Sequence, residues 1–221
     1  MAEIVHSPSA VLDDDMPKER TRARIVRKAC AQLFIVCAAR MDRGDRFGLG
    51  PDFLDKSTLG TRNLILLRDP YAENFQRGIG PRMASPAAVV EWYRQMQAEF
   101  SHVRETYAFG HSSGGYGAIL FGHLMEVDRV FAFAPSVAKL DGAVPARAAL
   151  VDAVRVHNGK TRYEIRYAPG NAVDHEFATR LGACPGFSLE PRPEFGAVHN
   201  VTGPLAMSGE LARILPPFVA A

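Results

Sequence analysis

Apolar residues in this chain fall into short continuous runs that alternate with longer stretches of helical spacing. The short runs are rich in β-branched and aromatic side chains and end at turn-forming residues, as is typical of strands buried on both faces of a sheet. They predict seven strands, at residues 23–26, 33–38, 63–67, 106–109, 130–134, 163–167 and 187–189. Because these strands alternate with predicted helices, the pattern indicates an α/β protein with a mostly parallel, twisted sheet flanked by helices.

Four stretches have the spacing of an amphipathic helix. The first begins at Pro86, with Ser85 as its N-cap, and its apolar positions continue to Phe100. The second begins just after Ser112 and continues to Leu124, and the others cover residues 173–181 and 205–215. Residues 40–62 and 136–146 are predicted to be loops, and loops of such length in a compact domain often contribute to function.

Composition and charge exclude several classes of protein. With 47% hydrophobic and 23% charged residues, the chain resembles an ordinary globular protein. Its 221 residues suit one domain, which we expect at residues 22–221 behind an N-terminal extension of residues 1–21. The 26 basic and 24 acidic residues are scattered along the chain, so we expect no nucleic-acid partner. No apolar run reaches the ~18 to 20 residues of a membrane span.

Cysteine content and short motifs limit the compartment and the chemistry. Cys30, Cys37 and Cys184 are an odd number without C-x-x-C spacing, which argues against a disulfide framework or a thiolate metal site. The acidic N-terminus lacks the features of a secretory signal, so we expect a cytoplasmic protein. Neither a metal nor a cofactor is predicted, because H-E-x-x-H, G-x-G-x-x-G and P-loop patterns do not occur.

One segment carries a recognisable catalytic pattern, Gly110-His111-Ser112-Ser113-Gly114. It fits G-x-S-x-G and stands between a predicted strand and a predicted helix, where this pattern forms a nucleophile elbow. The serine in such a turn is strained, and glycines beside it avoid clashes with neighbouring segments. We therefore predict Ser112 as a nucleophile and the Ser113 N–H, at a helix N-terminus, as a donor to an oxyanion. A plain glycine-rich turn and a phosphate-binding turn stay open as alternatives.

A serine hydroxyl needs a base to take its proton, and the base needs a carboxylate to orient it. Asp174 follows the predicted strand at 163–167, and His199 follows the last predicted strand, which is the chain order expected for acid and base. Asp174 could instead cap the helix that begins beside it. Asp141 and Asp152 are weaker candidates for the acid.

Further residues are predicted around this triad. The second oxyanion donor is expected in the loop after the strand at 33–38, which makes Ala39 or Arg40 the candidate and places Arg40 at the substrate. His111, beside the nucleophile, is expected to line the substrate pocket or to pack against it. The remaining histidines have weaker context as bases, in segments that look exposed, in a helix or beside the acid: His6, His102, His157, His123 and His175.

With these residues the chain resembles the α/β-hydrolase superfamily from about Arg22 onward. Within it the chain is most similar to compact bacterial serine-hydrolase-like proteins that often occur with polysaccharide and glycosyl-transfer functions. The matching segments are residues 63–69, 78–80, 113–118 and 131–136. The resemblance implies a sheet with a minimal cap or none, and therefore an open site. His111 and Ser113 depart from the residues expected beside the nucleophile, which implies an altered pocket.

These observations predict a serine hydrolase that cleaves an ester or a thioester through an acyl-enzyme on Ser112. An acyltransferase would use the same triad, because the two activities differ in what reaches the acyl-enzyme first. A non-catalytic accessory or binding module with this fold is the remaining alternative. The expected partner is a small-molecule or carrier-borne acyl substrate, and the expected assembly is a monomer or a homodimer.

Overall fold

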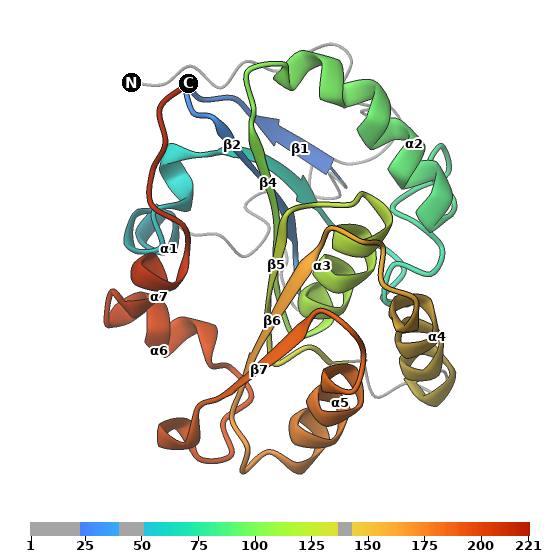
Figure 1. Cartoon of the computed structure of the whole chain (residues 1–221), viewed down its shortest axis with the longest axis vertical. Coiled ribbons are helices and arrows are strands. Elements are labelled where there is room, and N and C mark those ends of the chain that lie inside the picture. Colours follow the sequence, from blue (N-terminus) through green and yellow to red (C-terminus); the bar gives the residue numbers. More distant parts are fainter. Residues whose placement is uncertain (1–22, 40–50, 137–142) are drawn as a thin grey trace.

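A computed structural model describes residues 23–39, 51–136 and 143–221 of the chain. Its centre is a seven-stranded sheet in the order β1-β3-β2-β4-β5-β6-β7 (Figure 1). The strands are β1 (Ala23–Val26), β2 (Gln32–Cys37), β3 (Asn63–Leu67), β4 (Glu105–His111), β5 (Arg129–Phe133), β6 (Arg162–Tyr167) and β7 (Phe187–Pro191). β1 runs antiparallel to β3, and every other neighbouring pair is parallel. The prediction of a mostly parallel sheet is confirmed.

All seven predicted strands are present, with ends that differ by two residues at most. Every position of β2 and β3 is buried, which explains why both strands are continuously apolar after their first residues, Gln32 and Asn63. β4 is longer than predicted at its carboxyl end, because Gly110 and His111 still pair with Ala132 and Phe133 of β5. His111 is therefore the last residue of a strand and has a defined face of the sheet.

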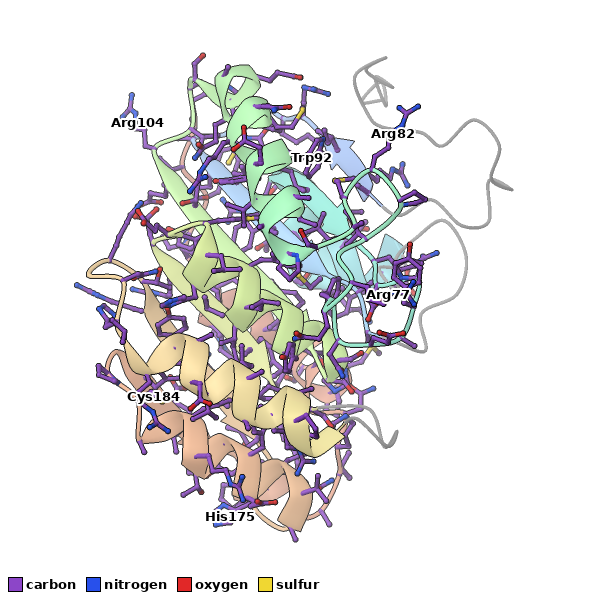
Figure 2. The ribbon with its side chains drawn as sticks, turned by 90° about the vertical axis from the view of Figure 1, so that its right-hand side faces the viewer. Arg77, Arg82, Trp92, Arg104, His175 and Cys184 are labelled. Carbon is purple, nitrogen blue, oxygen red and sulfur yellow. The ribbon has the colours of Figure 1, made fainter. Side chains whose placement is uncertain are left out.

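Helices cover both faces of the sheet (Figure 1). One face packs against α2 (Pro86–Gln97), α3 (Ser113–Leu124), α4 (Ala143–Arg155) and α5 (Ala172–Gly182). The other face packs against α1 (Pro51–Lys56), α6 (Thr202–Met207) and α7 (Glu210–Ile214). Figure 2 looks onto the first of these layers, in which Trp92 of α2 is buried in the apolar cluster between α2 and the sheet. The described part of the chain holds no helix long and apolar enough to cross a membrane.

The helix predictions need three corrections. α4 was not predicted and begins inside the predicted loop at 136–146; its first turn tolerates Pro145, and Leu150 and Val154 bury its apolar face. α1 and a short 3-10 turn at Leu59–Thr61 lie inside the predicted loop at 40–62. The helix predicted at 205–215 is two helices, α6 and α7, because Gly209 adopts φ 74° between them.

The other helix predictions are confirmed. The side chain of Ser85 accepts a hydrogen bond from the N–H of Ala88 at 3.2 Å, as expected of an N-cap followed by Pro86. α3 begins one residue after Ser112. Because β2, β4, β5, β6 and β7 are parallel, their carboxyl ends meet along one edge of the sheet, and those predicted site residues that the structure describes lie at this edge.

Candidate active site

Ser112 occupies the sharp turn between β4 and α3. Its backbone has φ 56° and ψ −126°, a region that residues with a side chain seldom occupy. The turn is held on both sides of the serine. The N–H of Ser112 donates to the carbonyl of Phe133 at 2.9 Å, and the Ser112 carbonyl accepts from the N–H groups of Tyr116 and Ser136 at 3.2 and 3.0 Å. The strained turn expected from the motif is therefore present and braced by β5.

The glycines around Ser112 stand where a side chain has no room. A Cβ atom on Gly110 would lie 2.0 Å from the carbonyl oxygen of Gly114, and one on Gly114 would lie 2.1 Å from the carbonyl oxygen of Cys37. At Gly115 the nearest atom would be Cα of Pro135, at 3.0 Å. The first two contacts are with backbone, which cannot rotate away. Glycine at these positions lets strand, turn and helix approach closely enough to form the elbow.

Ser112, His199 and Asp174 form one hydrogen-bonded chain. The Oγ of Ser112 lies 2.8 Å from Nε2 of His199, and Nδ1 of His199 lies 2.8 Å from Oδ2 of Asp174. A carboxylate can only accept, so Nδ1 carries the proton and Nε2 is free to accept from the serine hydroxyl. This is the arrangement required for a serine nucleophile with an oriented base.

Burial differs sharply between the acid and the base of this triad. The side chain of Asp174 is 2% exposed, whereas that of His199 is 37% exposed. Asp174 also lies in the first turn of α5, where the helix dipole favours a negative charge. The N-cap of α5 is Asn171, whose Oδ1 accepts from the Asp174 N–H at 3.3 Å. The alternative that Asp174 caps the helix is therefore wrong, and its carboxylate contacts His199 instead.

Those competing acids and bases that the structure describes lie away from Ser112. Asp152 is 67% exposed and pairs with Arg155 on α4, while Asp141 lies outside the described residues. Of the other described histidines, His123 contacts Tyr163, His157 contacts the carbonyl of Thr161, and His102 is exposed. His175 lies beside Asp174 in sequence but is exposed on α5, at the surface (Figure 2). His6 lies outside the described residues.

The predicted oxyanion donors come from two neighbouring segments. Ser113 is the first residue of α3 and is buried. The chain leaving β2 passes directly over this helix end, because a Cβ on Gly114 would lie 3.0 Å from the carbonyl carbon of Ala38. Ala39 follows at once, so its backbone is close to the elbow. Arg40, the other predicted donor and substrate contact, lies outside the described residues.

His111 contacts the base rather than standing apart from it. Its Nε2 lies 3.2 Å from the carbonyl oxygen of His199, and the two ring centroids are 5.1 Å apart. Burial, with a smaller contribution from the nearby His199 ring, lowers the pKa of His111 to about 4, against the opposing effects of the hydrogen bond to the His199 carbonyl and of the Asp174 charge. His111 is therefore neutral at neutral pH. This contact could not be predicted from the sequence, because the two residues belong to segments far apart in the chain.

The cysteines and possible metal ligands of the described residues provide no second reactive centre beside the triad. Cys30, Cys37 and Cys184 are buried and carry no disulfide. Cys37 ends β2 beside the elbow, and its burial raises the pKa of the thiol, which disfavours a thiolate nucleophile there. Within residues 23–39, 51–136 and 143–221, no three His, Cys, Asp or Glu side chains gather as a metal site would require.

Comparison with known proteins rests on structure, because the sequence matches no protein-family model and no curated protein. An alpha-beta serine hydrolase homologue from Coxiella burnetii is similar with a TM-score of 0.53 and 17% identity, over 88% of this chain and 91% of that one. The capsule O-acetyltransferase of Neisseria meningitidis serogroup A gives 0.52 and 10%, over 85% and 90%. An alpha/beta hydrolase from the metagenome of lagoon sediments at Mar Chica, Morocco, gives 0.52 and 12%, over 87% and 95%. The chain has the α/β-hydrolase fold of these proteins.

Proposed function

We propose that this protein is a serine-dependent acyl hydrolase that cleaves an ester or thioester through an acyl-enzyme on Ser112. The observation that carries the proposal is the distance of 2.8 Å between Ser112 Oγ and His199 Nε2, on a base that Asp174 orients. A hydroxyl becomes a useful nucleophile when a base within hydrogen-bond reach removes its proton. The strained elbow supports the same role, because such strain is concentrated at functional sites.

In the first half-reaction, Ser112 Oγ attacks the acyl carbon while His199 Nε2 takes the hydroxyl proton. The negative charge on the acyl oxygen is stabilised by the backbone N–H groups assigned to Ser113 and Ala39. The intermediate then collapses, the bond to the alcohol or thiol breaks, and His199 returns the proton to that leaving group. An acyl ester on Ser112 is left behind.

In the second half-reaction an acceptor attacks the acyl-enzyme. His199 takes a proton from the acceptor, and on collapse Ser112 Oγ leaves and recovers that proton. With water as the acceptor the result is hydrolysis, and with another hydroxyl it is acyl transfer. The exposure of His199, at 37%, lets an acceptor approach the base from solvent.

Acyl transfer is the second candidate function. The likeness to a capsule O-acetyltransferase over most of both chains supports it, since that protein moves an acetyl group on the same fold. The triad residues would be identical in either reaction. The third alternative, a non-catalytic module, fits less well, because such a module has no need for a serine, an imidazole and a carboxylate in hydrogen-bonded sequence.

Covalent labelling tests the proposal most directly. A fluorophosphonate probe is expected to label the wild-type protein and not Ser112→Ala, because the probe traps a serine activated by a base. Ser101→Ala is the matched control, since Ser101 is exposed in a turn after α2. Failure of the folded wild-type protein to react, or equal labelling of Ser112→Ala, would overturn the proposal.

A second experiment separates hydrolysis from transfer. Aryl esters with acyl chains of increasing length are offered to the wild-type protein, alone and with sugar hydroxyls as competing acceptors. Hydrolysis predicts free acid as the product whatever acceptor is added. Transfer predicts an acylated sugar at the expense of free acid, with Ser112→Ala lacking both products.

A further inference from the structure

We propose that His111 is a positioning residue that holds the base in place, by donating a hydrogen bond from its Nε2–H to the backbone carbonyl of His199. The inference rests on the proposed function, because it assigns a role in the same reaction. It replaces a contact with substrate, as expected from the sequence, by a contact with the protein itself. Three observations carry it: the face of β4 on which His111 lies, the hydrogen bonds at the His199 carbonyl, and the charge of the His111 ring.

The register of the sheet directs His111 toward the base. His111 pairs with Phe133 of β5 and is two residues beyond Phe109, so all three side chains lie on the same face. Phe109 and Phe133 belong to the apolar cluster beneath α6 and α7, together with Val201. The segment that carries His199 crosses this cluster on its way to α6. His111 therefore lies beneath that segment, between the cluster and the site.

The carbonyl oxygen of His199 accepts from two donors. One is His111 Nε2 at 3.2 Å, and the other is the N–H of Val201 at 3.1 Å. Val201 is completely buried, so this second donor is itself held by the core. On the opposite side, the imidazole of His199 is held by Asp174. Together these contacts fix both the backbone and the ring of the base, which leaves its Nε2 directed at Ser112.

To donate to the His199 carbonyl without repelling His199, the His111 ring must be neutral and carry its hydrogen on Nε2. A carbonyl oxygen can only accept, so Nε2 of His111 carries the hydrogen. The low pKa of about 4 means that the ring stays neutral at the pH where His199 acts as a base. With ring centroids 5.1 Å apart, a positive charge on His111 would oppose the positive charge that His199 acquires in the reaction. A neutral His111 holds His199 in position without that electrostatic repulsion.

Three substitutions at His111 test the role. His111→Phe keeps a ring and removes the donor, His111→Leu removes the donor without adding bulk, and His111→Gln places an amide nitrogen where Nε2 stood. Displacing a catalytic group by about 1 Å can cost on the order of 10²-fold in rate. We expect His111→Phe and His111→Leu to lower kcat by about 10- to 100-fold with KM within about 2-fold of wild type. We expect His111→Gln to recover most of kcat.

Matched controls use His175, which is exposed on α5 next to Asp174 in sequence. His175→Phe and His175→Gln are expected to keep wild-type kcat and KM. Unchanged kcat in both His111→Phe and His111→Leu would overturn the inference, and so would a raised KM with kcat preserved, which is the result expected of a substrate contact. These outcomes differ from failure of the proposed function, in which the wild-type protein itself does not react with a fluorophosphonate.

Discussion

Gly170 donates its backbone N–H to the carbonyl oxygen of Gly196 at 3.0 Å, and this contact joins the loop that carries the acid to the loop that carries the base. Asp174 follows Gly170 at the start of α5, and His199 follows Gly196 after β7. A Cβ atom on Gly170 would lie 2.5 Å from that same oxygen. The closeness of the two loops therefore depends on glycine at position 170, and it allows the carboxylate to reach the imidazole.

Replacing Gly170 with alanine is expected to separate these loops. The added methyl group meets backbone atoms of Gly196, so the loops have to move apart by several tenths of an ångström or more. We expect kcat to fall by about 10-fold or more, and the free energy of unfolding to fall by about 1–3 kcal/mol. Ester hydrolysis and urea denaturation measure the two effects.

Gly60→Ala is the control for this substitution. A Cβ on Gly60 would lie 3.4 Å from the nearest atom, Cβ of Leu54, which is an ordinary contact. Gly60 is in the 3-10 turn before β3, away from both loops. This variant is expected to keep wild-type kcat. Equal activity of Gly170→Ala and Gly60→Ala would show that the contact between the loops does not matter to catalysis.

Asp174→Asn tests the orientation of the base. The asparagine amide can donate to Nδ1 of His199, which favours the tautomer with the proton on Nε2 and leaves nothing to accept the Ser112 proton. We expect kcat to fall by on the order of 10³- to 10⁴-fold while the fold is retained. The matched control is Asp152→Asn on α4, where the exposed carboxylate pairs with Arg155 at 3.2 Å.

The two asparagine variants also decide between Asp174 and Asp152, two of the acids considered from the sequence. Loss of activity in Asp174→Asn with Asp152→Asn unchanged supports Asp174. The reverse result would contradict the assignment of the acid, whatever the geometry around His199. Circular dichroism of both proteins checks that the comparison is made between folded molecules.

The sheet could be predicted from the sequence because its signals are local. The central strands β2 and β3 are continuous apolar runs after a polar first residue, because they are buried on both faces of the sheet. The elbow could also be predicted, since Gly110, Ser112 and Gly114 lie within one short segment. The close approach of strand, turn and helix requires glycine at positions 110 and 114. Hydrophobic periodicity and backbone sterics are sufficient for these features.

The contacts that assemble the site could not be predicted in the same way. The Ser136 N–H that braces Ser112, the Gly170 contact with Gly196 and the His111 contact with His199 all join segments distant in sequence. Their partners are backbone atoms, which leave no mark on residue type. α4 was missed for a different reason, because glycine, proline and charge around residues 136–146 suggested a loop where the helix begins.

The glycines of the elbow make a graded prediction for stability. Alanine at Gly110 or Gly114 meets a backbone oxygen at 2.0 or 2.1 Å, whereas alanine at Gly115 meets Pro135 at 3.0 Å. We expect the first two substitutions to cost more than about 3 kcal/mol of unfolding free energy and the third about 1–2 kcal/mol. Since about 1 kcal/mol corresponds to about 2–4 °C in Tm for a chain of this size, thermal melting resolves the order.

A Tm for Gly115→Ala below those of both other variants would contradict this steric explanation. Soluble yield is a second readout, because the Gly110 and Gly114 variants are the ones expected to fold poorly. The comparison needs no knowledge of the substrate, so it tests the geometry of the elbow separately from the proposed chemistry.

The buried ring of His111 predicts how stability changes in acid. Its pKa is about 4 in the folded protein, below the ordinary value of 6.5, because burial disfavours the charged form. As the pH falls below 6.5 the unfolded chain binds a proton at His111 and the folded protein does not, so the stability that His111 contributes is lost progressively until the pH reaches about 4. His111→Gln cannot titrate there, whereas His199 and Asp174, which face the ring, are present in both proteins.

Urea denaturation of wild type and His111→Gln at pH 7, 5.5 and 4 isolates this effect. The difference in unfolding free energy, wild type minus variant, is expected to decrease by at most about 3 kcal/mol from pH 7 to pH 4. The acid sensitivity of groups that do not interact with position 111 cancels in that difference, because only position 111 changes. A difference that stays constant across this range would mean that burial does not hold the His111 ring neutral. The inference that a neutral His111 positions His199 without repelling its positive charge would then be wrong.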